Sequence, residues 1–562
     1  MTAPREIVVV AAVAALLYLP GLASIPFYTR GEPREALVAR EMVRTGEWLV
    51  PARPEGKLTR KPPLYYWAAA AALARLPDRP ELALRLPSAA LGTAAVVATW
   101  ATARRLYGPL AGLPAALVLA VAFEWVRAAT SARVDMALAA ALTAVLVSWA
   151  LAIAGASRRW LLVTVTGAAL GTLAKGPVAL VLAAATAAAA LAVRREREVI
   201  RRLRPLPVLA TAAALAGAWY AVAFLRQGSA FLDVVARENW LRFLDTKAGD
   251  TGHAHTLGYL VGLGLVGLLP WTPLLPLALA PLQSRPRAPA TTLLACWISV
   301  VFVFFSLASA KRSVYLLPLY PALAILVGAG VAAPPAGRTA AAARAAAQLY
   351  APGLALLAGA AAAVLLGLDP SAPLARVMHA DDAAGLPVVV AALRAARGPL
   401  LGLALATTAG AVVAFRAASR PEVAWRRIAL VVGALAVAWT AAFGAVVHPA
   451  IAEWQSLRRF LAGVDALVPA DATLVLRNAP EPGLRFYAPR PLRRLAPGEK
   501  PAGYLLLWDN ERGEIADRPG RLVTVLATSD VVRGRRGRLS LLAVSDSEPA
   551  TNAPLRRGSS RP

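Results

Sequence analysis

The sequence contains little cysteine and few acidic residues. Only one of its 562 residues is a cysteine, and because Cys296 lies inside an apolar run the chain can form no internal disulfide. Asp and Glu total 32 against 60 Lys and Arg, which gives a formal net charge of +28. The Arg residues sit in short loops and are not interleaved with aromatic residues on an amphipathic face. We therefore expect no nucleic-acid partner.

The chain has long apolar runs and no internal repeat of fixed period. Hydrophobic residues make up 58% of it, and apolar runs recur from residue 6 to residue 447, more than a soluble core could absorb. These run lengths exclude a β-barrel. The first run, Ile7–Leu22, follows a single Arg and precedes no Ala-x-Ala cleavage site, so we expect a retained first helix. The fold class predicted is an all-α polytopic membrane protein.

Fourteen apolar segments can be distinguished. They are 6–24, 62–77, 84–104, 108–127, 134–155, 160–175, 176–193, 205–225, 256–281, 290–309, 314–333, 346–368, 387–416 and 427–447.

Arg-rich loops predict the direction of these segments. The stretch 194–204 is the strongest cytoplasmic marker, and counting from it places Asp135, Lys175, the loop 226–255 and everything after residue 448 outside. A cytoplasmic N-terminus then leaves one crossing too many before residue 194. One segment between 62 and 128 therefore fails to span, and we predict about thirteen transmembrane helices.

Two regions are too polar for the membrane. In the external loop 25–61, the stretch 33–47 reads as an amphipathic interfacial helix. After the transmembrane domain 1–448, short alternating runs predict a small soluble α/β domain over 449–544, followed by a disordered tail over 545–562.

Charged residues flank the interfacial helix. Glu32 lies at its start, where the helix dipole favours an ionised carboxylate, and Arg34 follows within reach. Lys61 precedes Pro62 and Pro63 and so places an ammonium at headgroup depth on a stiff backbone. Such a cation suits a lipid phosphate, and a nearby carboxylate suits removal of a proton from an attacking hydroxyl. A plain membrane-surface helix is the alternative.

The motifs resemble a known family. The string YTRGEPREALVAREMVRTGEWLVP over 28–51, followed by RKPPL over 60–64, closely resembles the bacterial aminoarabinose lipid A transferases. These belong with the protein O-mannosyltransferases in the glycosyltransferase C (GT-C) superfamily. Further motifs match in order over about residues 5–330. They include RLPS at 85–88, AKGP at 174–177, LPW at 269–271 and SAKR at 309–312.

The resemblance implies an inverting transfer of a sugar from a polyprenyl-phosphate donor on the outer face of the bacterial inner membrane. It places the donor-phosphate lysine on Lys61 and a second acid on Asp135. The family usually has Asp-Glu where this chain has Gly31-Glu32, so Glu32 or Asp135 must take the catalytic role. Where the family has an acidic residue before the Lys-Pro-Pro motif, this chain has Arg60, which weakens the inference of a metal bound at that point.

The other candidate residues extend this site. The resemblance adds phosphate-binding cations and substrate-binding side chains. The alternative for the charged ones is that they lie on a solvated face or only set the orientation of the chain in the membrane. The phosphate-binding candidates are Arg34, Lys175, Lys311 and Arg312, and the substrate-binding candidates are Arg60, Tyr65, Glu238, Asn239, Arg242 and Tyr315. His253 and His255 form a weak metal signal, and no cofactor beyond a divalent metal is suggested.

Three classes of function compete. A lipid-linked-sugar glycosyltransferase leads, with membrane lipids around it and a lipid, glycan or protein acceptor. A transporter or flippase of lipid-linked sugars would need charges near the midplane, where Lys175 is the one residue that leans toward transport. A non-catalytic assembly protein is the third, because Gly31 supplies no carboxylate.

Overall fold

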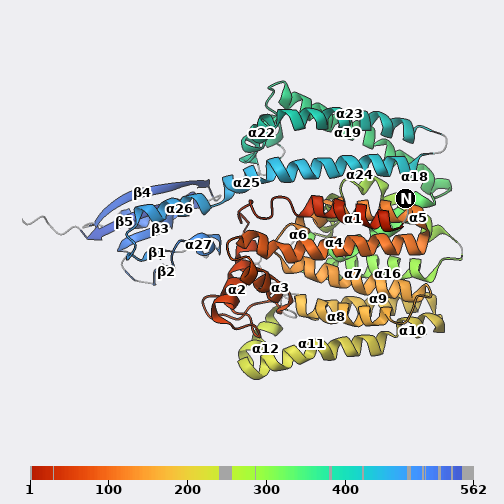
Figure 1. Ribbon diagram of the computed structural model, residues 1–562, viewed down its shortest axis with the longest axis horizontal. Helices are drawn as coiled ribbons and strands as arrows, with labels where there is room; N and C mark the ends of the chain where they lie inside the picture. Colours follow the sequence, from red (N-terminus) through yellow and green to blue (C-terminus); the bar gives the residue numbers. More distant parts are fainter. Residues whose placement is uncertain are drawn as a thin grey trace, which may run out of the picture.

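The computed structural model describes residues 3–546, apart from 30, 239–255, 285, 310, 377, 379–382, 421–422, 478–481, 497–498, 500–501, 517–520 and 533–535. Nearly parallel helices form an elongated bundle, and a small sheet domain lies beyond one end of it (Figure 1). The bundle end beside this domain also carries the helices α2 and α12.

Eight helical segments among the described residues are long and apolar enough to cross a membrane, or up to ten if each bent pair is one span. The eight are α4 (Pro80–Tyr107), α7 (Val134–Ile153), α10 (Arg197–Leu203) with α11 (Pro205–Gln227), α16 (Pro289–Leu307), η4 (Ser313–Leu319) with α17 (Tyr320–Ala332), α18 (Gly337–Gln348) with α19 (Tyr350–Leu365), α23 (Arg397–Ala418), and α24 (Trp425–Ala442) with η5 (Phe443–Val447) and α25 (His448–Gln455). The bent pairs are α5 (Pro109–Val121) with α6 (Phe123–Ala129), and α14 (Leu257–Gly267) with η3 (Thr272–Leu279) and α15 (Ala280–Gln283).

Three shorter helices run beside these long ones. They are α1 (Ala3–Tyr18), α8 (Trp160–Lys175) and α9 (Val178–Arg194), of 16, 16 and 17 residues (Figure 1). If all three crossed as well, the maximum of ten spans would become the thirteen that the sequence predicts. Helix α3 (Leu64–Arg75) is shorter still, with 12 residues and about 18 Å of helix against a hydrocarbon core of about 30 Å. Of the predicted segments between 62 and 128, 62–77 is therefore the one that falls furthest short of a span.

Small residues let the bundle helices approach closely. A Cβ added to Gly171 would lie 2.8 Å from the Cβ of Ala179, and one added to Gly167 would lie 2.9 Å from the carbonyl oxygen of Ala141. Such close backbone approach is what stabilises helix pairs where lipid removes the hydrophobic driving force.

Helix α2 (Gly31–Thr45) is the interfacial helix that the amphipathic pattern predicts. It buries Ala36, Leu37, Ala39 and Met42 against the bundle end, whereas Val43, expected on the apolar side, is 39% exposed. It packs against α3 and, across the chain, against α27 (Pro482–Tyr487). Figure 1 shows α2 beside α3 and α12 (Ser229–Ala236) at this end. Helices α20 (Ser371–Ala375) and α22 (Leu386–Ala395) complete the membrane part.

The C-terminal domain is a five-stranded mixed sheet of order β2-β1-β3-β5-β4. Strands β1, β2 and β3 pair in parallel, and β5 pairs antiparallel with β3 and β4. Helix α25 carries the last bundle helix on to Gln455, and the sheet domain follows it. Its elements are α26 (Arg458–Leu467), β1 (Leu474–Leu476), α27, β2 (Leu492–Arg494), β3 (Gly503–Trp508), α28 (Asp509–Ala516), β4 (Arg521–Val532) and β5 (Arg538–Asp546). Residues 547–562, most of the predicted tail, lie outside the described part.

Candidate functional site

A cavity of about 450 Å³ opens at the bundle end beside α2, a size typical of small-molecule sites. Its walls come from α2, the loop before α3, the start of α7, the end of α8, α14 and η4. The charged residues that line it are Arg34, Glu35, Arg53, Arg60, Lys61, Arg127, Arg133, Asp135, Lys175, Glu238, Lys311 and Arg312.

Two predicted site residues meet on facing helices. Asp135 lies in the first turn of α7 and Lys175 ends α8, and the ammonium donates to the carboxylate. Both side chains are 14% exposed. The Lys175 ammonium also lies 4.7 Å above the ring of Tyr315, a favourable cation–π contact. The position of Lys175, which is costly in lipid, is therefore explained by a polar cavity.

Lys61 faces a carboxylate from another part of the chain. Its ammonium lies 3.1 Å from Oε2 of Glu238, and Nε of Arg60 lies 3.5 Å from the other oxygen. Lys61 is 22% exposed and Arg60 is 61% exposed, so Lys61 is the more enclosed of the two cations. The structure thus brings Arg60 and Lys61 together with Glu238, which follows Lys61 by 177 positions.

Glu35, one helical turn after Gly31, is the carboxylate that α2 presents to the cavity. Its Oε1 accepts hydrogen bonds from Nε and Nη2 of Arg34, at 3.1 and 2.7 Å, and its Oε2 accepts one from the hydroxyl of Tyr66 at 2.5 Å. The charge of Glu35 raises the pKa of Arg34 against the opposing effect of burial. Arg34, which the sequence places within reach of Glu32, pairs with Glu35 instead.

Gly31 lines the cavity without a side chain, and a guanidinium occupies the adjoining space. A Cβ added to Gly31 would lie 3.1 Å from Nη2 of Arg133. Nε of Arg133 is buried and has no hydrogen-bond partner in the described part of the chain, and the same holds for Nε of Arg53. Both are buried guanidinium donors on residues that line the cavity.

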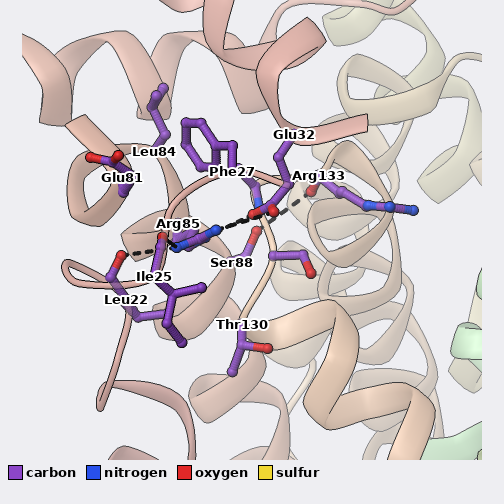
Figure 2. A network of polar contacts seen from close by, with 12 residues as sticks. Leu22, Ile25, Phe27, Glu32, Glu81, Leu84, Arg85, Ser88, Thr130 and Arg133 are labelled. Atoms are coloured by element: carbon purple, nitrogen blue, oxygen red, sulfur yellow. Dashed lines mark hydrogen bonds and ion pairs between the residues drawn. The ribbon is translucent and has the colours of Figure 1, made fainter. Parts of the chain in front are cut away.

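Glu32 faces away from the cavity. Its oxygens accept from Nε and Nη2 of Arg85 at 2.7 and 3.1 Å, and Oε1 also accepts the amide of Ala132 at 3.0 Å (Figure 2). The two side chains are only 4% and 3% exposed. Arg85 donates as well to the carbonyl oxygens of Leu22 and Ile25, at 3.1 and 2.6 Å. Glu32, for which the sequence predicts a catalytic role, is enclosed in this network and does not line the cavity.

Burial and charge act in opposite directions on Glu32. Burial favours its neutral form, but the charge and hydrogen bonds of Arg85, the amide of Ala132 and the charge of Arg133 outweigh it, so the pKa of Glu32 is lowered. A buried, ionised carboxylate held by a bidentate guanidinium is a structural anchor.

Other predicted residues divide between the cavity and its surroundings. Lys311, Arg312 and Tyr315 line it, and Lys311 donates to the carbonyl oxygen of Ala308 at 3.0 Å. Tyr65 is only 1% exposed, donates to the carbonyl oxygen of Leu84 at 2.6 Å and does not line the cavity. The neighbouring Tyr66 lines it instead, because successive side chains of α3 point in different directions.

Four predicted residues, Asn239, Arg242, His253 and His255, lie outside the described residues. Within the described ranges, no three His, Cys, Asp or Glu side chains gather closely enough to hold a metal ion.

The sequence reasoning missed several cavity residues. They are Glu35, Arg53, Tyr66, Arg127, Arg133 and Tyr259. A signal for Glu35 was present, because it follows Gly31 by four positions and so shares its helix face. Arg127 could not be found this way, since it reaches the site only through the bend between α5 and α6.

Comparison with known proteins gives the same picture. The model of the dolichyl-phosphate-mannose-protein mannosyltransferase family matches residues 60–226. Undecaprenyl phosphate-alpha-4-amino-4-deoxy-L-arabinose arabinosyl transferase of Aeromonas salmonicida is 30% identical over 324 residues, 56% of this chain and 58% of the relative. The Aeromonas hydrophila enzyme of the same name is 30% identical over 56% of this chain and 57% of the relative. The matches thus span a little under three fifths of these relatives.

A solved structure decides the fold. ArnT from Cupriavidus metallidurans, in the crystal structure bound to undecaprenyl phosphate, superimposes with a TM-score of 0.74 at 20% identity, covering 96% of this chain and 98% of that chain. The apo structure of the same protein gives 0.73. This chain resembles the aminoarabinose lipid A transferases and has their GT-C fold. As an ArnT-like multi-pass membrane protein, it departs from the family pattern in the two places noted, Gly31 and Arg60.

Proposed function

We propose that this chain is an inverting glycosyltransferase that moves a sugar from a polyprenyl-phosphate donor to a lipid acceptor on the outer face of the bacterial inner membrane. The cavity is the observation that carries the proposal. It gathers cations from α2, the α2–α3 loop, the end of α8 and the segment just before η4 at one end of an apolar bundle, where a lipid phosphate would lie. Undecaprenyl phosphate, named for the relatives, is the donor carrier we infer.

The proposed reaction is one displacement. An acceptor oxygen forms a bond to the anomeric carbon while the bond from that carbon to the phosphate oxygen breaks, and the phosphate leaves with the electron pair. Lys61, Arg34, Lys175, Lys311 and Arg312 would stabilise the charge that develops on the phosphate. No acid is required for this leaving group, because the phosphate departs as an anion.

The sugar and acceptor would lie against the remaining cavity residues. We propose Arg60, Tyr66, Glu238 and Tyr315 as substrate-binding side chains, with Asn239 and Arg242 kept as candidates from the sequence. For a hydroxyl acceptor, Asp135 is the proposed base, since it lines the cavity and Glu32 does not.

The transporter hypothesis depended on Lys175, which would have to lie near the membrane midplane. Lys175 shares the terminal cavity with Lys61 and Lys311. Charges that gather at one end of the bundle suit a reaction at the membrane surface, whereas a transporter needs sites near the midplane.

Comparing the glycolipids of a deletion strain with those of its parent by mass spectrometry tests the proposal. A lipid that lacks one sugar residue in the deletion strain, and regains it with the gene restored, would support it. Identical glycolipid profiles, together with no transfer from a polyprenyl-phosphate sugar by the purified protein, would overturn it.

Lys61→Ala tests the phosphate site. Loss of a charge-assisted contact of about 1.5–3 kcal/mol should lower the transfer rate by about 10- to 150-fold. Lys57→Ala is the matched control, because Lys57 is an exposed lysine of the same loop that does not line the cavity. Unchanged transfer and donor binding in Lys61→Ala would remove Lys61 from the site.

A further inference from the structure

The cavity has an unusual charge balance. Nine Lys or Arg side chains and three carboxylates line it within the described residues, an excess of six positive charges. One phosphodiester of a bound donor offsets only one of these charges. Any further group that enters the cavity therefore meets a positive field.

The three carboxylates are already held by cations. Arg34 pairs with Glu35, and Lys175 pairs with Asp135. Glu238 lies between Lys61 and Arg60. The charge of each carboxylate is thus already offset by a cation of the protein, and the positive excess of the cavity remains for a substrate ammonium to meet.

Gly31 lines this wall of the cavity but has no side chain, so it cannot supply an acidic group there. Its missing side chain leaves Nη2 of Arg133 only 3.1 Å from where a Cβ would be, and Nε of Arg133 has no partner among the described residues. Glu32, the next residue, is turned to Arg85 outside the cavity. The wall that begins α2 thus presents a guanidinium where a carboxylate could stand.

We propose that the sugar this chain transfers carries no ammonium group and is neutral or acidic. An ammonium would lie among guanidinium and ammonium groups with no uncommitted described carboxylate, a repulsion that the partly enclosed cavity screens less than water does. The inference rests on the proposed function. It separates this chain from the relatives, whose names specify a 4-amino sugar.

A panel of donors on one polyprenyl phosphate tests the inference. The purified protein receives the 4-amino-4-deoxy-L-arabinose donor, its N-acetylated form and the L-arabinose donor, with a lipid extract of the deletion strain as acceptor. At pH 7, kcat/KM for both uncharged donors should exceed that for the amino donor by at least about tenfold, as one uncompensated like charge produces. Equal values, or a preference for the amino donor, would overturn the inference.

Gly31→Asp supplies the missing carboxylate. The aspartate would pair with Arg133, whose guanidinium end can shift. The ratio of kcat/KM for the uncharged donors to kcat/KM for the amino donor should then fall by about tenfold. Gly31→Asn is the control of equal size without charge, and its ratio should stay at that of the unaltered protein. An equal change in both variants would overturn the role assigned to charge at this wall.

The two levels of the proposal fail differently. Transfer from none of the three donors would overturn the glycosyltransferase function and the inference with it. Transfer that favours the amino donor would leave the glycosyltransferase function intact and overturn the inference alone.

Discussion

Glu32 shows how a residue expected in the chemistry can hold the fold instead. Its carboxylate ties α2 to α4 through Arg85 and to the start of α7 through the amide of Ala132. Arg85 extends the network to the carbonyl oxygens of Leu22 and Ile25, in the turn after α1 (Figure 2). Removing one partner of such a pair leaves a buried charge without compensation.

Glu32→Gln should therefore lower the free energy of unfolding by about 3–5 kcal/mol, because Arg85 stays buried without its counter-charge. Denaturant or thermal unfolding of the purified protein measures this. Glu41→Gln is the control on the same helix, since Glu41 pairs with Arg44 at the surface and should change stability by less than about 1 kcal/mol. Equal stability of Glu32→Gln and the unaltered protein would refute the anchor.

The pKa of Glu32 gives this contribution a pH dependence. Its pKa is lowered from an ordinary value of 4.5, so the folded state binds the proton more weakly than the unfolded state does. The contribution is complete above pH 4.5 and is lost as the pH falls through the lowered pKa. The stability difference between Glu32→Gln and the unaltered protein should shrink below pH 4.5, and a difference that grew on acidification would contradict the sign.

At the scale of residues, the sequence predicted which charged residues lie in the site better than it predicted the partners of those residues. Lys61 and Asp135 were predicted in the site and line the cavity. The role of Glu32 could not be read, because its partner Arg85 lies 53 residues away and only the fold brings the two together. Tyr65 and Tyr66 could not be separated either, since which tyrosine faces a cavity depends on the rotation of a short helix.

At the scale of elements, α27 of the sheet domain holds the start of α2. The hydroxyl of Tyr487 accepts the amide of Phe27 at 2.6 Å and donates to Glu81 at 2.8 Å. The guanidinium of Arg40 lies 3.8 Å from the ring centroid of Phe486 and donates to the carbonyl oxygen of that residue at 3.0 Å. The sheet domain thus braces the helix that forms one wall of the cavity.

Tyr487→Phe should loosen this brace. Loss of the hydroxyl leaves the amide of Phe27 without a partner and leaves Glu81 only its ion pair with Arg458. We expect a cost of about 1–3 kcal/mol in the free energy of unfolding. We expect a modest fall in transfer rate to accompany it, because α2 carries Arg34 and Glu35. Thermal unfolding and a transfer assay measure the two effects.

Tyr504→Phe is the control for this change. Tyr504 lies on β3, and its hydroxyl makes no hydrogen bond with the described residues, so stability and transfer should both stay unchanged. If Tyr487→Phe left stability and transfer as unchanged as Tyr504→Phe does, the hydrogen bonds of Tyr487 would not stabilise the fold or the site.

Helix periodicity predicted α2, and the alternating runs after residue 448 predicted a domain that contains strands, as β1, β3 and β4 show. The contact between α27 and α2 could not be predicted, because its hydrogen bond joins residues 446 positions apart. The 66° bend between α5 and α6 was also missed. Hydropathy reads 108–127 as one helix, whereas the amide of Phe123 leaves the helix to donate to the carbonyl oxygen of Leu269 at 3.1 Å.

At the scale of the whole molecule, the cavity and the Arg-rich helix α10 lie at opposite ends of the bundle (Figure 1). Helix α2 and the sheet domain lie at the same end as the cavity. The counting of Arg-rich loops predicted this separation before any helix was placed. It could do so because orientation in a membrane depends on loop charges, which the sequence displays directly.

The orientation itself can be tested by cysteine labelling in a Cys296→Ser background, where the one native thiol, which is buried, is removed. Glu198→Cys lies on α10 and Arg459→Cys lies on α26, with native side chains that are 43% and 80% exposed. If the Arg-rich end faces the cytoplasm, a membrane-impermeant maleimide applied to intact cells with a permeabilised outer membrane should label position 459 and leave 198 unlabelled. Lysing the cells should make both positions reactive, which controls for thiol access. Labelling at 198 from outside would reverse the orientation, and the cavity would then open toward the cytoplasm, where the proposed transfer on the outer face could not take place.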